Sequence, residues 1–505
     1  IVDASKGFVK VGNKNQLRAS DIKKITDAVI HRETIDKFSR LVSIEEIREN
    51  DYNLNIPRYV DSSEESETWD IYSIMNGGIP KTELRSLDKY WNAFPSLKNE
   101  LFNDLNSSYV ELKNEDIKSI ISSNEEISNY LENFESKFND FDTFMNQHLI
   151  DNMTSLNISK EHEDISNEIF NRLESFDLLD KYVAYQALED EWVSTSIDLE
   201  IIQTEGFDAV KKVDPNMVIK KKNNKEEEVQ DGWVGRVIPF DLAQKSLLIS
   251  ELESIASKEN RQNEIQSEFD EIIDSLNEED KDKLLNDDNT SFDSSKLKEE
   301  MMSIFNDVST KEIVTLYEYL DLLNSGCKKN EKIQFIENHD KVIWENIEPN
   351  KDGTYGKGKV NNYLKQLKMN YEFSDNTYEK IIKNAYDLFE EEKQLKKDIK
   401  TETTNLHNKT KEVIESLSDE QALELLKNKW ISPLIDAIIK LPQDIINDIS
   451  SKVKTINDKY KTTLSEITDE IEENQTTLIS LIDELEGDDF DMEGLSELKS
   501  LLSGD

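Results

Sequence analysis

Apolar residues recur at intervals of three and four positions along most of this chain, which is the spacing of helices with one buried face. Two examples are residues 84–94, where the apolar stripe is stopped by Pro95, and residues 175–192, SFDLLDKYVAYQALEDEW. A highly charged segment with the same spacing covers residues 241–285. The pattern predicts a mainly α-helical chain.

Two segments depart from this spacing. Residues 193–237 look extended, with a lysine-rich and then glutamate-rich tip at 220–228, so we predict a small β element there. Residues 327–376 are the least regular, and we predict an irregular loop. The glycines of DGTYGKGKV (352–360) fit neither GxxxxGK[ST] nor GxGxxG, which favours a plain surface loop over a phosphate-binding one.

The end of the chain carries a heptad-like seam. It comprises Ile446, Ile449, Val453, Ile456 and Tyr460 and, after one extra step of four, Leu464, Ile467, Ile471, Asn474, Leu478, Leu481 and Leu485. The extra step is a stutter, and the polar Asn474 at a seam position is typical of register or partner selection. We predict a C-terminal helical hairpin or coiled coil over 401–486, with 401–417 pairing antiparallel to the last helix. A long helix folded back on its own chain remains the alternative. Trp430 is predicted to be an internal packing anchor.

The seam also predicts a partner interface, because a long apolar stripe left partly exposed is an aggregation hazard unless another chain covers it. The predicted interface residues are Ile449, Val453, Ile456, Ile467, Ile471, Asn474 and Leu478.

Charge limits the kinds of partner. The 505 residues contain 61 basic and 107 acidic side chains, a net charge of −46, so the average surface repels nucleic-acid phosphates. Lys6, Lys10, Lys14 and Arg18 form the best local candidate for a DNA-proximal patch, with a solvated lysine-bearing loop as the alternative.

Metal, disulfide and membrane chemistry receive no support from the sequence. Cys327 is the single cysteine, and the five histidines are scattered without zinc-ligand spacing. No run of about 18 apolar residues occurs, so we expect a cytoplasmic protein without a membrane span. The first residue is isoleucine, and we expect the natural protein to begin upstream.

One string resembles a known family. Residues 42–60, VSIEEIRENDYNLNIPRYV, combine a short amphipathic helix with an alternating strand-like run, and follow IVDAS (1–5) and NKNQLR (13–18). Together they resemble the segment after the catalytic domain in the modification (M) subunit of type I restriction-modification systems, which are adenine-N6 DNA methyltransferases. Residues 175–192 are loosely similar to that family, and 425–485, with a KW motif before the last helices, more closely.

The resemblance implies a mainly α fold that begins with the last strand or strands of a Rossmann-like methyltransferase domain. It implies that the intact protein transfers a methyl group from S-adenosylmethionine to adenine N6. It also implies docking of the C-terminal helices on a specificity (S) subunit, a restriction (R) subunit in the larger complex, and DNA contact through that complex.

The catalytic chemistry is not encoded in these residues. Adenine methylation needs a flipped base held by an [ND]PP[FY] turn, and the nearest sequence, Asp214-Pro215-Asn216, lacks the second proline and the aromatic residue. We therefore assign no catalytic, cofactor-binding or metal residue, and predict that this chain alone is inactive and binds no S-adenosylmethionine.

We divide the chain into the end of a methyltransferase domain and its exit segment (1–61), a helical region (62–192), an extended insertion (193–240), charged helices with an irregular loop (241–400), a C-terminal hairpin or coiled coil (401–486) and an acidic tail (487–505). The alternative function is a non-enzymatic acidic coiled-coil protein, either a DNA mimic or a structural adaptor.

Overall fold

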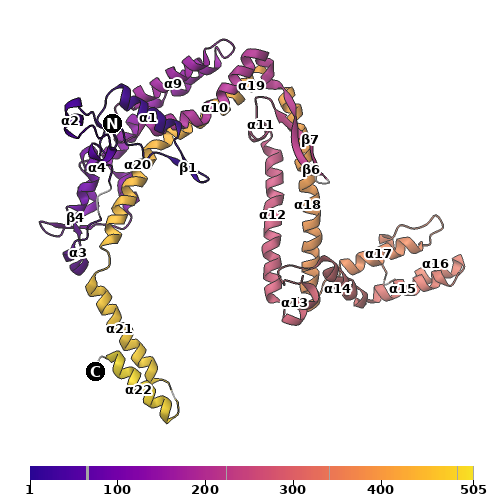
Figure 1. The fold of residues 1–505 in the computed structure, drawn as a ribbon. Helices are drawn as coiled ribbons and strands as arrows, with labels where there is room; N and C mark the ends of the chain where they lie inside the picture. The colour runs from indigo at the N-terminus through magenta and orange to yellow at the C-terminus, as the bar shows by residue number, and fades with distance from the viewer. Residues whose placement is uncertain (64–66, 223–224, 341, 486, 504–505) are drawn as a thin grey trace. The chain divides into compact units, whose positions relative to one another are not determined.

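The computed structural model describes residues 1–63, 67–222, 225–340, 342–485 and 487–503. Helices dominate and the strands form only small sheets (Figure 1), which confirms the predicted mainly α class. The chain forms two compact units, residues 1–214, 235–242 and 414–505 in unit 1 and residues 215–234 and 243–413 in unit 2. Among the described helices, none combines the length and apolar character needed to cross a membrane.

Unit 1 is built mostly from helices of about one to eight turns. Its α-helices are α1 (Ala19–Ile30), α2 (Ile44–Glu49), α3 (Ile71–Asn76), α4 (Asp88–Ala93), α5 (Leu97–Leu101), α6 (Ile117–Ser123), α7 (Glu125–Phe138), α8 (Phe141–Met145), α9 (Ile158–Leu173), α10 (Lys181–Glu205), α19 (Asp419–Trp430), α20 (Ser432–Lys459), α21 (Leu464–Asp483) and α22 (Asp489–Ser503). Short 3₁₀ turns are η1 (Ile56–Arg58), η2 (Glu83–Leu87) and η4 (Phe207–Lys211), and η3 (Asn146–Ile150) is a π-turn.

Strands in unit 1 are few and antiparallel. β1 (Val9–Val11) pairs with β2 (Lys14–Gln16), and β3 (Ile79–Pro80), β5 (Tyr109–Leu112) and β4 (Phe102–Asp104) form a three-stranded sheet in that order. Ile1 and Asp3 run beside 38–40, with Asp3 N donating to Phe38 O at 2.7 Å. The predicted Rossmann-like strands are not confirmed, because the described strands of this segment form an isolated hairpin. The strand-like run predicted after α2 is instead η1.

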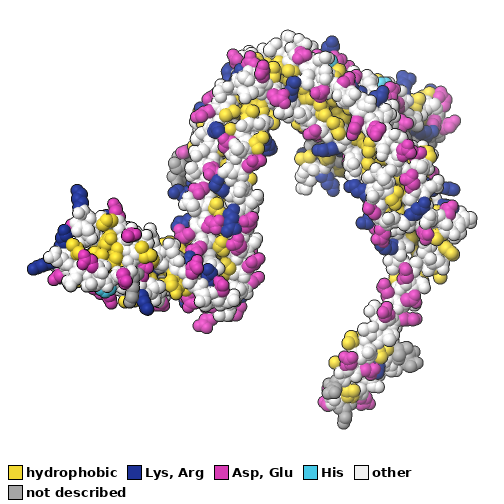
Figure 2. Space-filling view, turned by 180° about the vertical axis from the view of Figure 1, so that it is seen from behind, with side chains coloured by type: hydrophobic (Ala, Val, Ile, Leu, Met, Phe, Trp, Pro, Cys, Tyr) yellow, Lys and Arg dark blue, Asp and Glu magenta, His cyan; other side chains and the backbone are white. Residues whose placement is uncertain are grey.

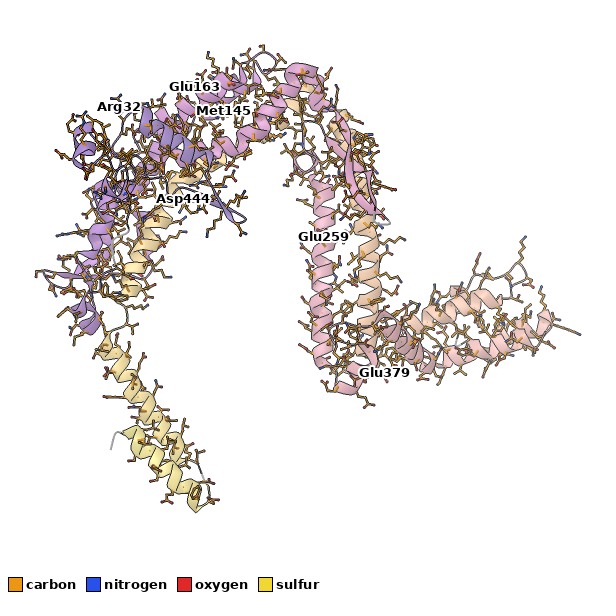
Figure 3. All side chains as sticks on the ribbon, viewed as in Figure 1. Arg32, Met145, Glu163, Glu259, Glu379 and Asp444 are labelled. Carbon is orange, nitrogen blue, oxygen red and sulfur yellow. The ribbon has the colours of Figure 1, made fainter. Side chains whose placement is uncertain are left out.

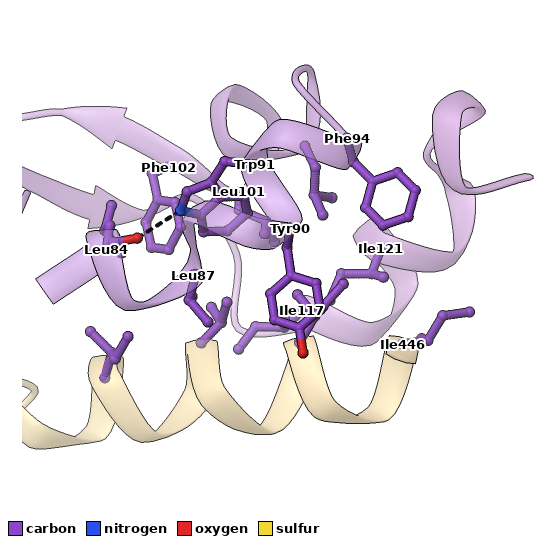
Figure 4. Packing of buried hydrophobic residues seen from close by; sticks show 14 of the residues in the cluster. Leu84, Leu87, Tyr90, Trp91, Phe94, Leu101, Phe102, Ile117, Ile121 and Ile446 are labelled. Carbon is purple, nitrogen blue, oxygen red and sulfur yellow. Dashed lines mark hydrogen bonds between the residues drawn. The ribbon is translucent and has the colours of Figure 1, made fainter. Parts of the chain in front are cut away.

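The first half of the predicted seam lies in the core of unit 1. Ile449 and Val453 of α20 are fully buried among side chains of α4 to α6. Figure 4 shows Tyr90 and Ile117 of this cluster lying against the α20 ribbon. In the same cluster Trp91 Nε1 donates to Leu84 O at 2.8 Å. Tyr460, 3% exposed, follows α20, and Thr463 caps the next helix through a reciprocal bond with Glu466. The stutter is therefore a break between two helices.

The long helix α10 corrects one boundary. The predicted extended segment begins at 193, but α10 continues to Glu205 and ends at Gly206, whose φ is +85°. Leu199 and Ile202 are buried on one face of the helix, and this tertiary packing outweighs the β-branched residues that suggested a strand. The β element is the two-stranded sheet of β6 (Val213–Lys222) and β7 (Lys225–Gly235). Two residues of the predicted tip, 223 and 224, lie outside the described residues.

Unit 2 contains two long helices that run antiparallel. Its helices are α11 (Phe240–Leu247), α12 (Ile249–Ser275), α13 (Glu278–Leu284), α14 (Ser294–Asp307), α15 (Lys311–Asn324), α16 (Lys329–Asn338), the 3₁₀ turn η5 (Trp344–Asn346), α17 (Lys357–Met369) and α18 (Tyr378–Glu415). α12 and α18 lie side by side (Figure 3), joined by the ion pairs Arg261–Glu391 and Lys258–Glu402, both 2.8 Å.

The pairing predicted for 401–417 differs from the one observed. Leu406 of α18 packs with Leu248 and Ile255 at the start of α12, whereas Ile449 and Val453 of α20 pack with α4 to α6. Each helix therefore has another partner, and the predicted coiled coil over 401–486 is not confirmed. Periodicity identifies a buried face but not the helix that covers it.

The predicted irregular loop at 327–376 is wrong over much of its length. It contains α16, η5 and α17, which pack on α15 around Tyr319, Trp344 and Tyr363. The apolar stripes of these helices are short and are separated by glycine-containing and polar turns, so the sequence shows no long periodic stripe.

Candidate functional site

The second half of the seam is exposed on α21. Ile467, Ile471 and Leu478 are 42%, 51% and 44% exposed, and Asn474 is also exposed. In contrast, Ile449 and Val453 are fully buried and Ile456 is 9% exposed. The structure therefore divides the predicted interface into three internal core residues and four residues that face solvent. A continuous apolar helix face in water is characteristic of an interaction surface.

A neighbouring short helix also carries exposed apolar side chains. α3 lies beside α21, and its Ile71, Tyr72 and Met75 are 74%, 50% and 50% exposed. The ring of Tyr72 stacks on Tyr109, with centroids 4.7 Å apart, which fixes its position. Sequence analysis missed these residues, although their spacing of one and four positions was a visible signal. We call the exposed apolar residues of α3 and α21 the α3–α21 face.

The N-terminal segment forms a pocket with α10. The pocket has a volume of about 550 Å³, in the range of small-ligand sites. Four basic side chains line it, Lys6, Arg18, Lys24 and Lys37, together with four acids, Asp3, Asp21, Asp180 and Asp190. The formal charges balance, so the pocket is polar without being an anion site.

Acidic and basic side chains of the pocket pair with one another. Arg18, the residue before α1, donates from Nε and Nη2 to the two carboxylate oxygens of Asp21 at 3.0 and 3.1 Å. These hydrogen bonds lower the pKa of Asp21 and raise that of Arg18. Lys24 lies 3.9 Å from Asp180, and its ammonium stands 5.0 Å from the centre of the Phe38 ring.

The four residues predicted as DNA-proximal do not form one patch. Lys6 and Arg18 line the pocket. Lys10 and Lys14 are exposed on the β1–β2 hairpin, where Lys10 is opposite Asn15 and Lys14 is opposite Val11. Because neighbouring cross-strand pairs point to opposite faces, these two lysines project in opposite directions.

Helix α10 anchors the N-terminal segment. Tyr182 OH donates to the buried Asp27 of α1 at 3.2 Å, and the Ser20 backbone N donates to Gln186 Oε1 at 3.0 Å. Burial raises the pKa of Tyr182, and the Asp27 carboxylate adds to this. The YVAYQ sequence of 182–186 thus supplies both the apolar and the polar contacts that hold α1 in place.

One group of side chains has the donor set of a metal site. His148 on the π-turn, with Glu161 and Asp164 on α9, brings one ring nitrogen and two carboxylate oxygens within 4.8 Å of one another. His148 Nδ1 already lies 2.6 Å from Glu161. Sequence spacing did not indicate this group because its members belong to two elements.

Comparison with known proteins identifies the N-terminal segment. Residues 1–68 match the N-6 DNA Methylase family. The MjaVII methylase subunit of the type I restriction enzymes of Methanocaldococcus jannaschii is 45% identical over 73 residues, 14% of this chain and 13% of that protein. The MjaVIII methylase subunit of the same organism is 40% identical over 73 residues, with the same coverage.

A third relative, the MpnII methylase subunit of Mycoplasma pneumoniae, is 33% identical over 78 residues, 15% of this chain and 14% of its own length. The chain thus spans about a seventh of the curated relatives it matches. No solved structure matches the chain. The predicted resemblance to type I modification subunits is confirmed for the N-terminal segment, and the similarities noted at 175–192 and 425–485 stay predictions.

Methylase families use S-adenosylmethionine, whose methionine moiety sits at a glycine-rich turn between a strand and a helix. The residues present do not fit that group. Among the described residues of the matched segment, 1–63 and 67–68, the only helix with more than two turns is α1, and it follows the antiparallel β2. Its N-terminus is occupied by the Arg18–Asp21 pair.

Proposed function

We propose that this chain is the C-terminal assembly portion of a type I restriction-modification M subunit. The intact protein then transfers a methyl group from S-adenosylmethionine to adenine N6 in DNA, at sites chosen by an S subunit and within a complex that also holds an R subunit. The match of residues 1–68 to the methylase family supports this proposal. It does not favour the alternative of an acidic DNA mimic or adaptor.

The assembly role rests on one observation, the exposure of the apolar stripe on α21. Ile467, Ile471 and Leu478 follow one another at helical spacing with 42% or more of each side chain in solvent. We infer that an apolar helical surface of the S subunit covers the α3–α21 face. Each aliphatic side chain buried there contributes roughly 1.5 to 3 kcal/mol.

Co-purification tests the proposal. We expect the tagged S subunit to retain this chain, and Ile467→Asp with Ile471→Asp to abolish retention while leaving the melting temperature unchanged. Glu470→Gln with Glu473→Gln is the control, since it alters exposed polar positions of the same helix. Retention of the Ile467/Ile471 variant at wild-type level would show that the docking surface lies elsewhere.

A further inference from the structure

Helix α17 carries a basic surface within a strongly acidic chain. Its 13 residues, KGKVNNYLKQLKM, include four lysines and no acid, against a net charge of −46 for the whole chain. Figure 2 shows single Lys and Arg side chains projecting from the end of unit 2 that α15 to α17 form. A local surface of this sign attracts the counter-charge that the rest of the chain repels.

The lysines of α17 divide into supporting and exposed ones. Lys368 is 8% exposed and lies over the Tyr317 ring at 5.3 Å, so it belongs to the packing of the helix. Lys359 pairs with Glu348 at 3.1 Å. Lys357 and Lys365 are exposed two turns apart, about 12 Å along the helix axis. Lys357 Nζ also donates to the Asn324 amide oxygen at 3.0 Å, an exposed hydrogen bond that leaves its charge uncompensated.

The surface between these two lysines is rich in hydrogen-bond donors. The exposed residues of α17 are Lys357, Gly358, Asn361, Asn362, Lys365, Gln366 and Met369. Lysine ammonium, asparagine and glutamine amides and the first N–H groups of a helix are the usual donors to nucleic-acid phosphates. Gly356, which precedes the helix, supplies no capping side chain for those N–H groups.

The opposite side of α17 holds this surface rigidly and keeps a nearby acid away from it. Val360 and Leu364 are buried in the cluster shared with α15. Glu312 of α15 accepts from Tyr363 OH at 3.0 Å and from Ile343 N at 3.1 Å. Its carboxylate is thus directed into the packing between the helices.

We propose that the exposed face of α17, centred on Lys357 and Lys365, binds the phosphate backbone of duplex DNA without reading its sequence. This contact goes beyond assembly with the S subunit, and it does not depend on the α3–α21 face. Two lysines about 12 Å apart, with amide side chains between them, can contact phosphates along one strand, and such a contact adds affinity without specificity.

Fluorescence anisotropy of the full chain with a labelled duplex tests this contact. We expect a Kd on the order of 10⁻⁵ M at low salt. Lys357→Gln with Lys365→Gln weakens binding at least about tenfold and reduces the slope of log K against log salt by about 2. Lys357→Arg with Lys365→Arg keeps the charge and retains the affinity.

The matched control is Lys397→Gln with Lys400→Gln, which removes the same charge from two exposed positions of another lysine-bearing helix, α18. We expect it to retain the wild-type affinity when the comparison is made at about 0.1 M salt, where screening confines each contribution to within about 10 Å. If both glutamine double variants lose the same amount of DNA affinity, the effect is one of net charge alone and the proposal is overturned. Absence of measurable binding by the wild-type chain at low salt would overturn it as well.

Discussion

Trp430, the last residue of α19, donates its indole N–H to a carboxylate oxygen of Asp198 on α10 at 2.8 Å. Lys429 donates to the same oxygen and, at 2.7 Å, to the Val237 carbonyl. Trp430 and Asp198 are 1% and 4% exposed. A single carboxylate therefore joins segments of unit 1 that lie 232 residues apart in the sequence.

Asp198→Ala should destabilise unit 1 by roughly 3 to 5 kcal/mol, because it leaves the Lys429 ammonium without its charged partner. Asp198→Asn retains an oxygen acceptor for Trp430 and should cost less. Urea unfolding followed by tryptophan fluorescence measures both. A loss below about 1 kcal/mol for the alanine variant would mean that Lys429 finds another acceptor or reaches water.

The two halves of the seam should respond oppositely to truncation. Ile449→Ala opens a cavity in the core and should cost about 2 to 5 kcal/mol. Ile471→Ala removes an exposed side chain and should change stability by no more than about 0.5 kcal/mol. Thermal unfolding of both variants measures this difference. An equally large loss at Ile471 would mean that this side chain packs within the chain and does not face solvent.

The α3 contribution to docking is testable separately from α21. Ile71→Asp should weaken retention by the S subunit, because Ile71 is 74% exposed on the α3–α21 face. Met302→Asp introduces the same charge at a 51% exposed position of unit 2 and should have no effect. If both variants bind like wild type while the α21 variant does not, the partner covers α21 alone.

A hydrogen bond between Tyr90 and Asp448 should make part of the stability pH-dependent. Burial pushes the pKa of Asp448 upward, but hydrogen bonds from Lys452 and Tyr90 outweigh this effect, and the net pKa lies below its ordinary value of 3.8. A lowered folded-state pKa stabilises the fold above pH 3.8, and that contribution is lost as the pH falls through the folded-state value.

Burial and the same carboxylate raise the pKa of Tyr90, so its contribution is complete below its unfolded-state pKa of 10.0 and disappears at higher pH. Tyr90→Phe should therefore differ most from wild type near neutrality and converge with it in acid. Chemical unfolding of both proteins from pH 7 to pH 2 measures this difference. A difference independent of pH would assign the effect of Tyr90 to packing alone.

Two glycines with similar backbone conformations allow a further comparison. Gly232 and Gly326 have φ values of +79° and +75°, but an added Cβ would lie 2.6 Å from His407 Nε2 at Gly232 and in open space at Gly326. His407 Nε2 also accepts from the Trp233 backbone N at 2.9 Å. Gly326→Ala should cost about 1 kcal/mol from strain, and Gly232→Ala about 1 to 3 kcal/mol more. Equal melting temperatures would show that His407 moves aside freely.

The sequence pattern predicted where helices form more reliably than it predicted which elements pack against each helix. The stripe at Ile449 and Val453 identified a buried face, but the side chains that cover it come from 84–127, more than 300 positions away. No residue pattern within α20 itself indicates which segment covers its buried face. The exposed extension of the stripe at Ile467 and Ile471 has the same composition, so only tertiary contacts separate core from surface.

The candidate sites show the same limit. The similarity of the first 60 residues to methylases was recognisable because it lies in one continuous stretch of sequence, and the family match confirms it. The pocket lined by Arg18 and Asp190 joins segments more than 150 residues apart, and no spacing rule connects them. Lys10 and Lys14 looked like partners in sequence, yet the hairpin register turns them to opposite faces.

The break between Tyr460 and Leu464 separates two sets of residues whose sequences are constrained in different ways. Ile449 and Val453 are constrained by the core around them, whereas Ile467 and Ile471 are constrained only by whatever covers them. Substitutions in α21 can therefore change the choice of partner without lowering the stability of the core. Two related systems in one cell must keep their subunits from cross-pairing, and a helix that is free to change provides the means of telling them apart.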